Sequence, residues 1–590
     1  MQTKHFVTDP KHLVEASLKS LCLVQPDLTL DIENKTIYSP KRKDGVSQVS
    51  IISGGGAGHE PSFTGFVGDG LLSAAVSGSV FASPSSRQVL NAIENVDASK
   101  GVLVTVMRYT GDVLNFGVAL EKARARNPDM KIEMLVVGDD VAVTRSRAGK
   151  VGRRGIAGTV LVHKVTGAMA AAGFGLDDTV RVGQLAAKNL VSVGVSLNRV
   201  HVPGRPVESD IEKTPGSDDI ELGMGIHNET GCGRRNGTDA EAPSIVKEML
   251  QQLLDSNDHD RNYLPQKTPE MVLLVNNLGA LSVLELGAIV TEVAEQLQRD
   301  YKVKVVRLYA GTFMTSLDGP GFSISLLNVV ETGVSKSLIE LLDAPSNARG
   351  WSSLTTQGES TKRQNGTSAQ ITKPDNEGET QADQLAYDAD LVDSRLRAGL
   401  KAVIDSEPEV TKYDDIVGDG DCGTTLKRGA EAILNQIAKT PPTGVIALLS
   451  LITSTVEDTM DGTSGALYSI FLNSLLHHVK LAANQASAAD TTFWKKALSA
   501  ALSALSKYTP AQVGDRTMMD ALIPFAETLR STGDLRAASS AAQEGATKTK
   551  DMRPALGRTV YIGDEDAWLG KIPDPGAYGL SKFFEGLSST

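Results

Sequence analysis

The chain has 590 residues, of which 41% are hydrophobic and 22% charged, and its formal net charge is −12. A chain of this length exceeds what one hydrophobic core supports, so we expect two or more domains. The negative charge argues against a general role in nucleic-acid binding or at a membrane surface.

Other simple features favour a reduced, cytoplasmic protein. The three cysteines, Cys22, Cys232 and Cys422, lie far apart and form no CxxC pair, which argues against disulfides and a zinc site. The N-terminal stretch has no secretion or transit signal. No apolar run is long enough to cross a membrane.

The first 351 residues alternate short apolar runs with helical patterns. Strands are expected at residues 49–52, 101–107, 132–137, 271–277 and 322–327. This alternation predicts an α/β domain with parallel strands over residues 1–351. Because ligands bind beyond the carboxyl ends of such strands, the polar loops that follow them are candidate sites.

Three residues in such loops could carry chemistry. His59 ends a loop at residues 53–61 whose four glycines leave backbone N–H groups open to a small polar ligand. Asp112 follows the strand at 101–107 and could converge with His59 as an acid–base partner. The alternatives are a tight turn with a surface histidine, and an Asp112 that only caps a helix. His227, in GMGIHNETG at 223–231, could be a base, a ligand or a nucleophile.

The second part of the chain has a different character. Residues 352–384 are polar and rich in Gly, Ser and Thr, which predicts a flexible linker. Residues 385–590 show apolar side chains at helical spacing between Gly, Pro and Thr breaks, and no strand pattern is persuasive. We therefore expect an all-α bundle of about eight helices.

An acidic run is the most informative motif of this bundle. Asp414, Asp419 and Asp421 lie close together, interleaved with glycines. Crowded carboxylates repel one another, and hard oxygen ligands of this kind suit Mg²⁺ bridged to phosphates. Loops at 461–465, 514–520 and 574–577 could complete a nucleotide site, with Met518 packed on a base. Solvated acidic or helix-capping turns are the alternatives.

Together these motifs resemble those of the dihydroxyacetone kinase family, in its ATP-dependent, two-domain, single-chain form. The resemblance covers nearly the whole chain outside the linker. It is carried by SGGGAGHEP, YTGDVLNFG, VGRRGIAGTVLVHK, ELGMGIHNETG, VGDGDCGTTL, GTSGALYSIFL, TMMDAL and DPGA, in this order. No single one of these motifs would suffice.

For the N-terminal domain, the resemblance implies a triose-binding site. His227 would hold dihydroxyacetone, and glyceraldehyde as well, as a covalent hemiaminal. His59 and Asp112 would assist deprotonation of the substrate hydroxyl. The substrate-binding surface would comprise Gly56, Ala57, Gly58, His59, Met107 and Asp112.

For the C-terminal domain, the resemblance implies a helical barrel that binds ATP. Asp414, Asp419 and Asp421 would hold two Mg²⁺ ions on the phosphates. The nucleotide contacts would come from Asp421, Cys422, Gly423, Thr424, Ser464, Gly465, Thr517, Met518, Asp574, Pro575 and Gly576. The family also implies a homodimer and a role in glycerol metabolism.

Several positions depart from the family pattern. Met107-Arg108 replaces Lys-Asn, so a hydrogen-bond donor to the ketone is lost and either Arg108 or a different substrate must compensate. Asp461 adds a negative charge beside the phosphates. Ala57 replaces a serine and Thr230 a proline. Three alternatives therefore stand beside a dihydroxyacetone kinase: a kinase of another small ketose or aldose, cleavage of FAD to cyclic FMN, and a non-enzymatic regulatory protein. The retained aspartates disfavour the last.

Overall fold

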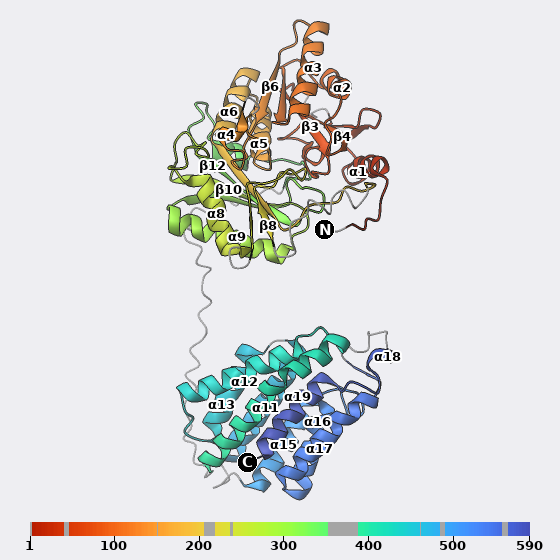
Figure 1. Cartoon of the computed structure of the whole chain (residues 1–590), viewed down its shortest axis with the longest axis vertical. Helices are drawn as coiled ribbons and strands as arrows, with labels where there is room; N and C mark the ends of the chain where they lie inside the picture. Colours follow the sequence, from red (N-terminus) through yellow and green to blue (C-terminus); the bar gives the residue numbers. More distant parts are fainter. Residues whose placement is uncertain are drawn as a thin grey trace. The chain divides into compact units, whose positions relative to one another are not determined.

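The computed structural model describes residues 3–40, 46–149, 152–205, 219–236, 240–351, 388–460, 462–483, 490–556 and 565–589. The chain forms two compact units, Met1–Gly366 and Thr367–Thr590, each with its own hydrophobic core (Figure 1). The predicted linker at 352–384 lies outside the described residues. None of the described helices is long and apolar enough to cross a membrane.

The described residues of the first unit form two six-stranded sheets, and the first sheet has the order β1-β2-β4-β3-β5-β6. Its strands are β1 (Thr29–Asp31), β2 (Thr36–Tyr38), β3 (Ser50–Ala57), β4 (Ala74–Val80), β5 (Val102–Met107) and β6 (Ile132–Val137). The strands β4, β3, β5 and β6 are parallel, and β2 and β1 add an antiparallel edge. The strands predicted at 49–52, 101–107 and 132–137 are confirmed.

The second sheet has the order β11-β10-β12-β7-β8-β9. Its strands are β7 (Leu190–Ser196), β8 (Ile220–Leu222), β9 (Gly233–Arg235), β10 (Glu270–Asn277), β11 (Lys304–Gly311) and β12 (Gly321–Asn328). The prediction of parallel strands is wrong for this sheet, because among its described strands only the β10–β11 pair is parallel. The segment 312–320 is too short for the crossover that a parallel β12 would need, so β12 runs back along β10.

Helices cover both sheets in layers (Figure 1). α2 (Ser86–Asn95) and α3 (Thr110–Arg126) pack on one face of the first sheet. α5 (Thr159–Ala171) and α6 (Leu176–Lys188) lie in a core that also takes in apolar side chains from both sheets. α8 (Ala242–Leu254) and α9 (Val283–Tyr301) cover the second sheet. The remaining α-helices among the described residues of this unit are α1 (Pro10–Val24), α4 (Arg145–Ala148) and α10 (Leu338–Asp343).

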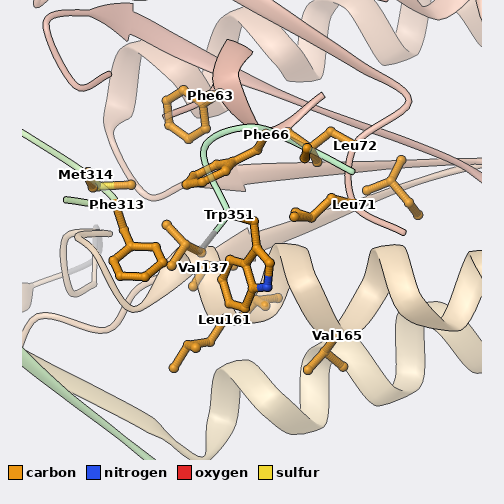
Figure 2. Close-up of a cluster of buried hydrophobic side chains, with 14 of the residues drawn as sticks. Phe63, Phe66, Leu71, Leu72, Val137, Leu161, Val165, Phe313, Met314 and Trp351 are labelled. Carbon is orange, nitrogen blue, oxygen red and sulfur yellow. The ribbon is translucent and has the colours of Figure 1, made fainter. Parts of the chain in front are cut away.

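The shared core closes around Trp351, the last described residue of the first unit. Its indole lies among Phe66, Leu161 and Phe313 (Figure 2), and the Trp351 and Phe313 rings are 5.6 Å apart. Trp351 is buried. A large aromatic side chain buried here fastens the end of the unit onto its centre.

The second unit is all-α in its described residues, as predicted. Its helices are α11 (Ala389–Val417), α12 (Cys422–Lys439), α13 (Val445–Thr459), α14 (Gly462–Ala483), α15 (Thr491–Leu505), α16 (Met519–Thr532), α17 (Leu535–Lys548), α18 (Glu565–Trp568) and α19 (Pro575–Ser588). They surround an apolar cavity of about 590 Å³ lined by side chains such as Leu400, Leu449 and Phe525. This arrangement confirms the expected helical barrel.

Candidate active site

The glycine-rich segment before His59 is mainly strand, which corrects the predicted loop. β3 continues through Ala57, because glycine lets the neighbouring chain approach closely. A Cβ at Gly54 would collide with the Val76 carbonyl, and one at Gly56 would lie 2.8 Å from the Ala82 nitrogen. Gly58, with φ of 98°, turns the chain out of the strand and delivers His59 to the site.

His59 and His227 meet edge to face. The two Nε2 atoms are 2.9 Å apart, and His59 Nδ1 lies 2.8 Å from the Thr315 carbonyl oxygen. The His59 side chain is fully buried. Burial, and then the nearby His227, lowers the pKa of His59 to about 3, so this imidazole is neutral at physiological pH.

Asp112 belongs to the same site. α3 begins after Tyr109, and Asp112 lies in its first turn rather than at the N-cap, so the capping alternative is wrong. The Asp112 side chain is buried, and its Oδ1 has no hydrogen-bond partner among the described residues. Burial raises the pKa of Asp112 to about 6, although a hydrogen bond from Ser83 and the charge of His227 oppose the rise.

Two aromatic rings that the sequence analysis missed enclose the histidines. The Phe81 ring stacks on His59 at 5.2 Å and meets His227 edge-on, and the Tyr109 ring lies 4.7 Å from the His227 ring. Phe81 has φ of 56°, in the left-handed region that bulky residues rarely adopt. Strain of this kind concentrates at functional sites. No sequence pattern reports such a φ angle.

The turn that carries His227 is fixed by its neighbours. Asn228 exchanges two hydrogen bonds with the backbone of Val200, and Arg199 donates to the Asn228 carbonyl oxygen and to Thr230 Oγ1. A proline at Thr230 could not accept this bond, so the departure from the family pattern has a local contact. Glu229, also missed, lies 3.1 Å from His227 Nδ1. Its position, two residues after His227 in the same turn, is the sequence feature that could have indicated a contact between the two side chains.

The structure places the other predicted substrate residues as follows. Ala57 is buried at the end of β3, and Met107, the last residue of β5, is 3% exposed and packs in the shared core. A Cβ added at Gly152 would lie 3.0 Å from Arg108 Cδ, so the Arg108 side chain runs along that glycine. Met107 thus offers apolar packing where the family pattern has a donor.

The acidic run joins two helices of the second unit. Asp414 is buried in the last turn of α11 and accepts a hydrogen bond from the Cys422 backbone, whereas Asp421 is the N-cap of α12. One carboxylate oxygen from each of Asp414, Asp419 and Asp421 lies within 4.8 Å of the others. Three hard oxygen donors at this spacing fit a divalent cation such as Mg²⁺.

A cavity of about 450 Å³ opens beside the acidic run. The predicted nucleotide residues that line it are Asp421, Cys422, Ser464, Thr517, Met518, Asp574, Pro575 and Gly576. Gly423, Thr424 and Gly465 are not among the lining residues. Gly423 and Gly465 allow close backbone packing, since a Cβ there would collide with Thr411 and Met460, respectively. Thr424 is exposed and donates to the Asp421 carbonyl oxygen. Asp461 lies outside the described residues.

Charged groups of unusual pKa also line this cavity. Burial, and then the charges of Asp520 and Asp414, raises the pKa of Asp574 to about 7, against a hydrogen bond from Ala577 and the charge of Arg516. Arg516, in the predicted loop at 514–520, is buried, donates to the Thr549 and Ile572 carbonyl oxygens and stacks on the Trp568 ring. It joins three chain segments at the wall of the cavity.

The Dak1 domain model matches residues 19–350, and the DAK2 domain model matches residues 416–589. The chain is 41% identical to dihydroxyacetone kinase of Pichia angusta, over 100% of this chain and 98% of the relative. It is 36% identical to triokinase/FMN cyclase of Homo sapiens, over 98% and 97%. The dihydroxyacetone kinase from C. freundii in complex with AMP-PNP and Mg²⁺ matches over 100% of this chain and 99% of its own, with 31% identity and a TM-score of 0.60. The chain therefore belongs to the dihydroxyacetone kinase family.

Proposed function

We propose that this protein is an ATP-dependent dihydroxyacetone kinase. The observation that carries the proposal is the pairing of two different sites in one chain: the His59–His227 pair in the first unit and the acidic cluster beside a cavity in the second. The first suits a small carbonyl compound and the second a metal-bound nucleotide. The full-length relative from Pichia angusta and the AMP-PNP complex from C. freundii support this assignment.

In the first unit, His227 Nε2 is the nucleophile for the substrate carbonyl. Its lone pair adds to the carbonyl carbon, the carbonyl oxygen takes up a proton, and the ring gives up the proton on its other nitrogen, which gives a neutral hemiaminal with no net change in protons. An aldehyde reacts in the same way, so glyceraldehyde is a second substrate, whereas glycerol has no carbonyl to trap. Asp112, whose pKa is about 6, accepts the proton of the hydroxyl that is phosphorylated, and His59 assists. The pocket surface includes Gly56, Ala57, Gly58 and Met107.

In the second unit, Asp414, Asp419 and Asp421 would hold Mg²⁺, and the cavity that Met518 and Asp574 line would take ATP. When bound, Mg²⁺ neutralises charge on the transferring phosphoryl group. The buried Asp414 also fixes the Cys422 backbone N–H, so it sets the geometry of the turn. We further propose a cytoplasmic homodimer that serves glycerol metabolism.

The test is ADP release by the purified full-length chain with Mg²⁺ and ATP. Dihydroxyacetone should support turnover and glycerol should not. His227→Ala should lower kcat/KM for dihydroxyacetone by a factor of at least about 10³, the scale of a lost nucleophile. A His227→Ala protein with unchanged kcat/KM would exclude the covalent mechanism. Light scattering at several protein concentrations tests the homodimer.

Two observations identify alternative activities that should be measured beside the proposed one. Met107 offers no hydrogen bond to a ketone, which favours a panel of three- and four-carbon ketoses and aldoses as competing substrates. The similarity to the triokinase/FMN cyclase of Homo sapiens favours an assay for cyclic FMN released from FAD. A higher kcat/KM for another sugar, or cyclic FMN formation at a comparable rate, would replace the proposed activity.

A further inference from the structure

The phenyl ring of Phe81 contacts both histidines of the first site. It stacks on His59 with ring centroids 5.2 Å apart and an interplanar angle of 19°, and it meets His227 edge-on at 5.2 Å and 83°. The Nε2 atoms of the two histidines are only 2.9 Å apart, so a ring that touches both imidazoles lies beside the atoms that receive the substrate carbonyl. The proposed reaction gives this ring no role.

The glycines before His59 make room for Phe81. A Cβ at Gly56 would lie 3.1 Å from Phe81 Cα, and a Cβ at Gly58 would lie 2.8 Å from Phe81 Cε1. The Phe81 backbone N–H also donates to the Ala57 carbonyl oxygen at 2.9 Å, which joins its backbone to the end of β3. On the side where a Cβ would point, the space at both glycines is therefore filled by Phe81.

The chain accepts backbone strain to hold the ring at this place. Phe81 has φ of 56°, and Leu317, whose Cδ2 would lie 3.3 Å from the same Cβ at Gly58, has φ of 51°. Bulky side chains rarely adopt the left-handed region, and such strain persists where the surrounding structure enforces it, most often at functional sites. Two strained residues at one glycine, beside the histidines, indicate that the ring serves the site as well as the packing.

The groups that meet the substrate have little open surface. The Tyr109 ring adds a further wall, 4.7 Å from the His227 ring. His59 is fully buried, Asp112 is 6% exposed, and the His227 side chain is 19% exposed. A site enclosed to this degree suits a short substrate, because each additional carbon needs space that closely packed rings already occupy.

We propose that Phe81 is a specificity-determining residue that limits the substrate to three carbons. The proposal rests on the proposed function, because it concerns the carbonyl compound that reacts at His227. A ketose with one more CHOH group meets the phenyl ring, whereas dihydroxyacetone ends before it. Two residues further along, Ser83 donates a hydrogen bond to Asp112, so one short segment positions both the ring and the base.

The experiment measures ADP release by the full-length chain with dihydroxyacetone and with erythrulose, the four-carbon 2-ketose. Neither sugar can form a furanose or pyranose ring, so both present a free carbonyl. In Phe81→Ala, the ratio of kcat/KM for erythrulose to kcat/KM for dihydroxyacetone should rise at least about 10-fold, because one carbon unit in a fitted site changes selectivity by about 10- to 200-fold. Phe81→Leu should give a smaller rise.

Two further variants separate substrate selection from stability. Glycine adopts φ of 56° without strain, so Phe81→Gly should unfold at a higher temperature than Phe81→Ala and show the same kcat/KM ratio. Phe63→Leu is the matched control for Phe81→Leu. Phe63 packs on Gly55, where a Cβ would lie 2.6 Å from its Cε2, and its ring faces His163. Phe63→Leu should change kcat/KM for both sugars by the same factor.

An unchanged ratio in both Phe81→Ala and Phe81→Gly, or an equal rise in Phe63→Leu, overturns the inference. A wild type with a higher kcat/KM for erythrulose than for dihydroxyacetone overturns it as well. Failure of the proposed function has a different signature, because the wild type would then release no ADP with dihydroxyacetone, and the inference would fall with it.

Discussion

Burial favours the neutral form of two side chains in the first site and therefore shifts their pKa values in opposite directions. The buried His59 stays neutral because its pKa falls to about 3, while the pKa of Asp112 rises to about 6. A carboxyl group with such a pKa changes its charge near the pH at which the protein works, as general acid–base chemistry requires. Asp112 therefore serves the reaction at a cost in stability.

That cost predicts the behaviour of Asp112→Asn. The folded-state pKa of Asp112 lies above its ordinary value of 3.8, so this group lowers the stability of the fold progressively as the pH rises from 3.8 to about 6, and the full cost remains above that pH. At pH 8 the asparagine variant should be more stable by about 1–3 kcal/mol, and at pH 4 this gain should be small. Urea unfolding at the two pH values measures it, and equal effects at both would contradict the burial argument. Its kinase activity should be lost.

A second residue-level prediction concerns Asp414, which combines metal binding with a hydrogen bond to Cys422. Asp414→Asn should lower kcat/KM for Mg²⁺–ATP by about 100-fold or more, because a charged ligand is lost at the transferring phosphate. Binding of dihydroxyacetone to the other unit should not change. The rate of ADP release at varied Mg²⁺–ATP measures kcat/KM, and calorimetric titration measures the binding of each ligand. The expected role of Asp414 is wrong if its loss weakens both ligands equally.

At the scale of elements, close packing of β3 against β4 brings His59 to its partners. Gly54→Ala would drive a Cβ into the Val76 carbonyl and should lower the free energy of unfolding by about 1–3 kcal/mol. Gly117→Ala on α3 is the matched control, since a Cβ there meets nothing within 4 Å. Gly117→Ala should raise the free energy of unfolding by about 0.5–1 kcal/mol, as expected when alanine replaces glycine in a helix. Denaturant unfolding compares the two variants. Equal changes in the free energy of unfolding would show that the packing of β3 against β4 accommodates a Cβ at Gly54.

The same strand shows what the sequence could reveal about the fold. Apolar runs located β3, β5, β6, β10 and β12 because strand burial depends on local composition. The glycines at the end of β3 predict a turn, and only their close packing against the partner strand shows that they belong to the sheet. The reversed direction of β12 also depended on pairing between distant segments. The same holds for the site: His59, Asp112 and His227 stood out as residue types, whereas the contacts of Phe81 and Glu229 arise only in the folded chain.

At the scale of the whole molecule, each unit has its own core and its own tryptophans. Trp351 reports on the first unit, and Trp494 and Trp568 report on the second. We expect two unfolding transitions, one for each unit. Dihydroxyacetone should raise the unfolding temperature of the first unit, and Mg²⁺–ATP should raise that of the second unit. A ligand at 100 times its Kd contributes about 2.7 kcal/mol.

Thermal unfolding followed by calorimetry and fluorescence tests this separation. His227→Ala should abolish the shift caused by dihydroxyacetone and leave the shift caused by Mg²⁺–ATP. A single transition that both ligands raise would show that the two units unfold together.

The apolar cavity of about 590 Å³ inside the helical barrel also makes the second unit compressible. Water fills such a void when the helices separate, so unfolding reduces the volume of the system, and hydrostatic pressure favours the unfolded state. The first unit, where an indole and several phenyl rings fill the centre, should resist pressure better. Under rising pressure, the fluorescence of Trp494 and Trp568 should change before that of Trp351, so that nucleotide binding is lost while the triose site is still folded.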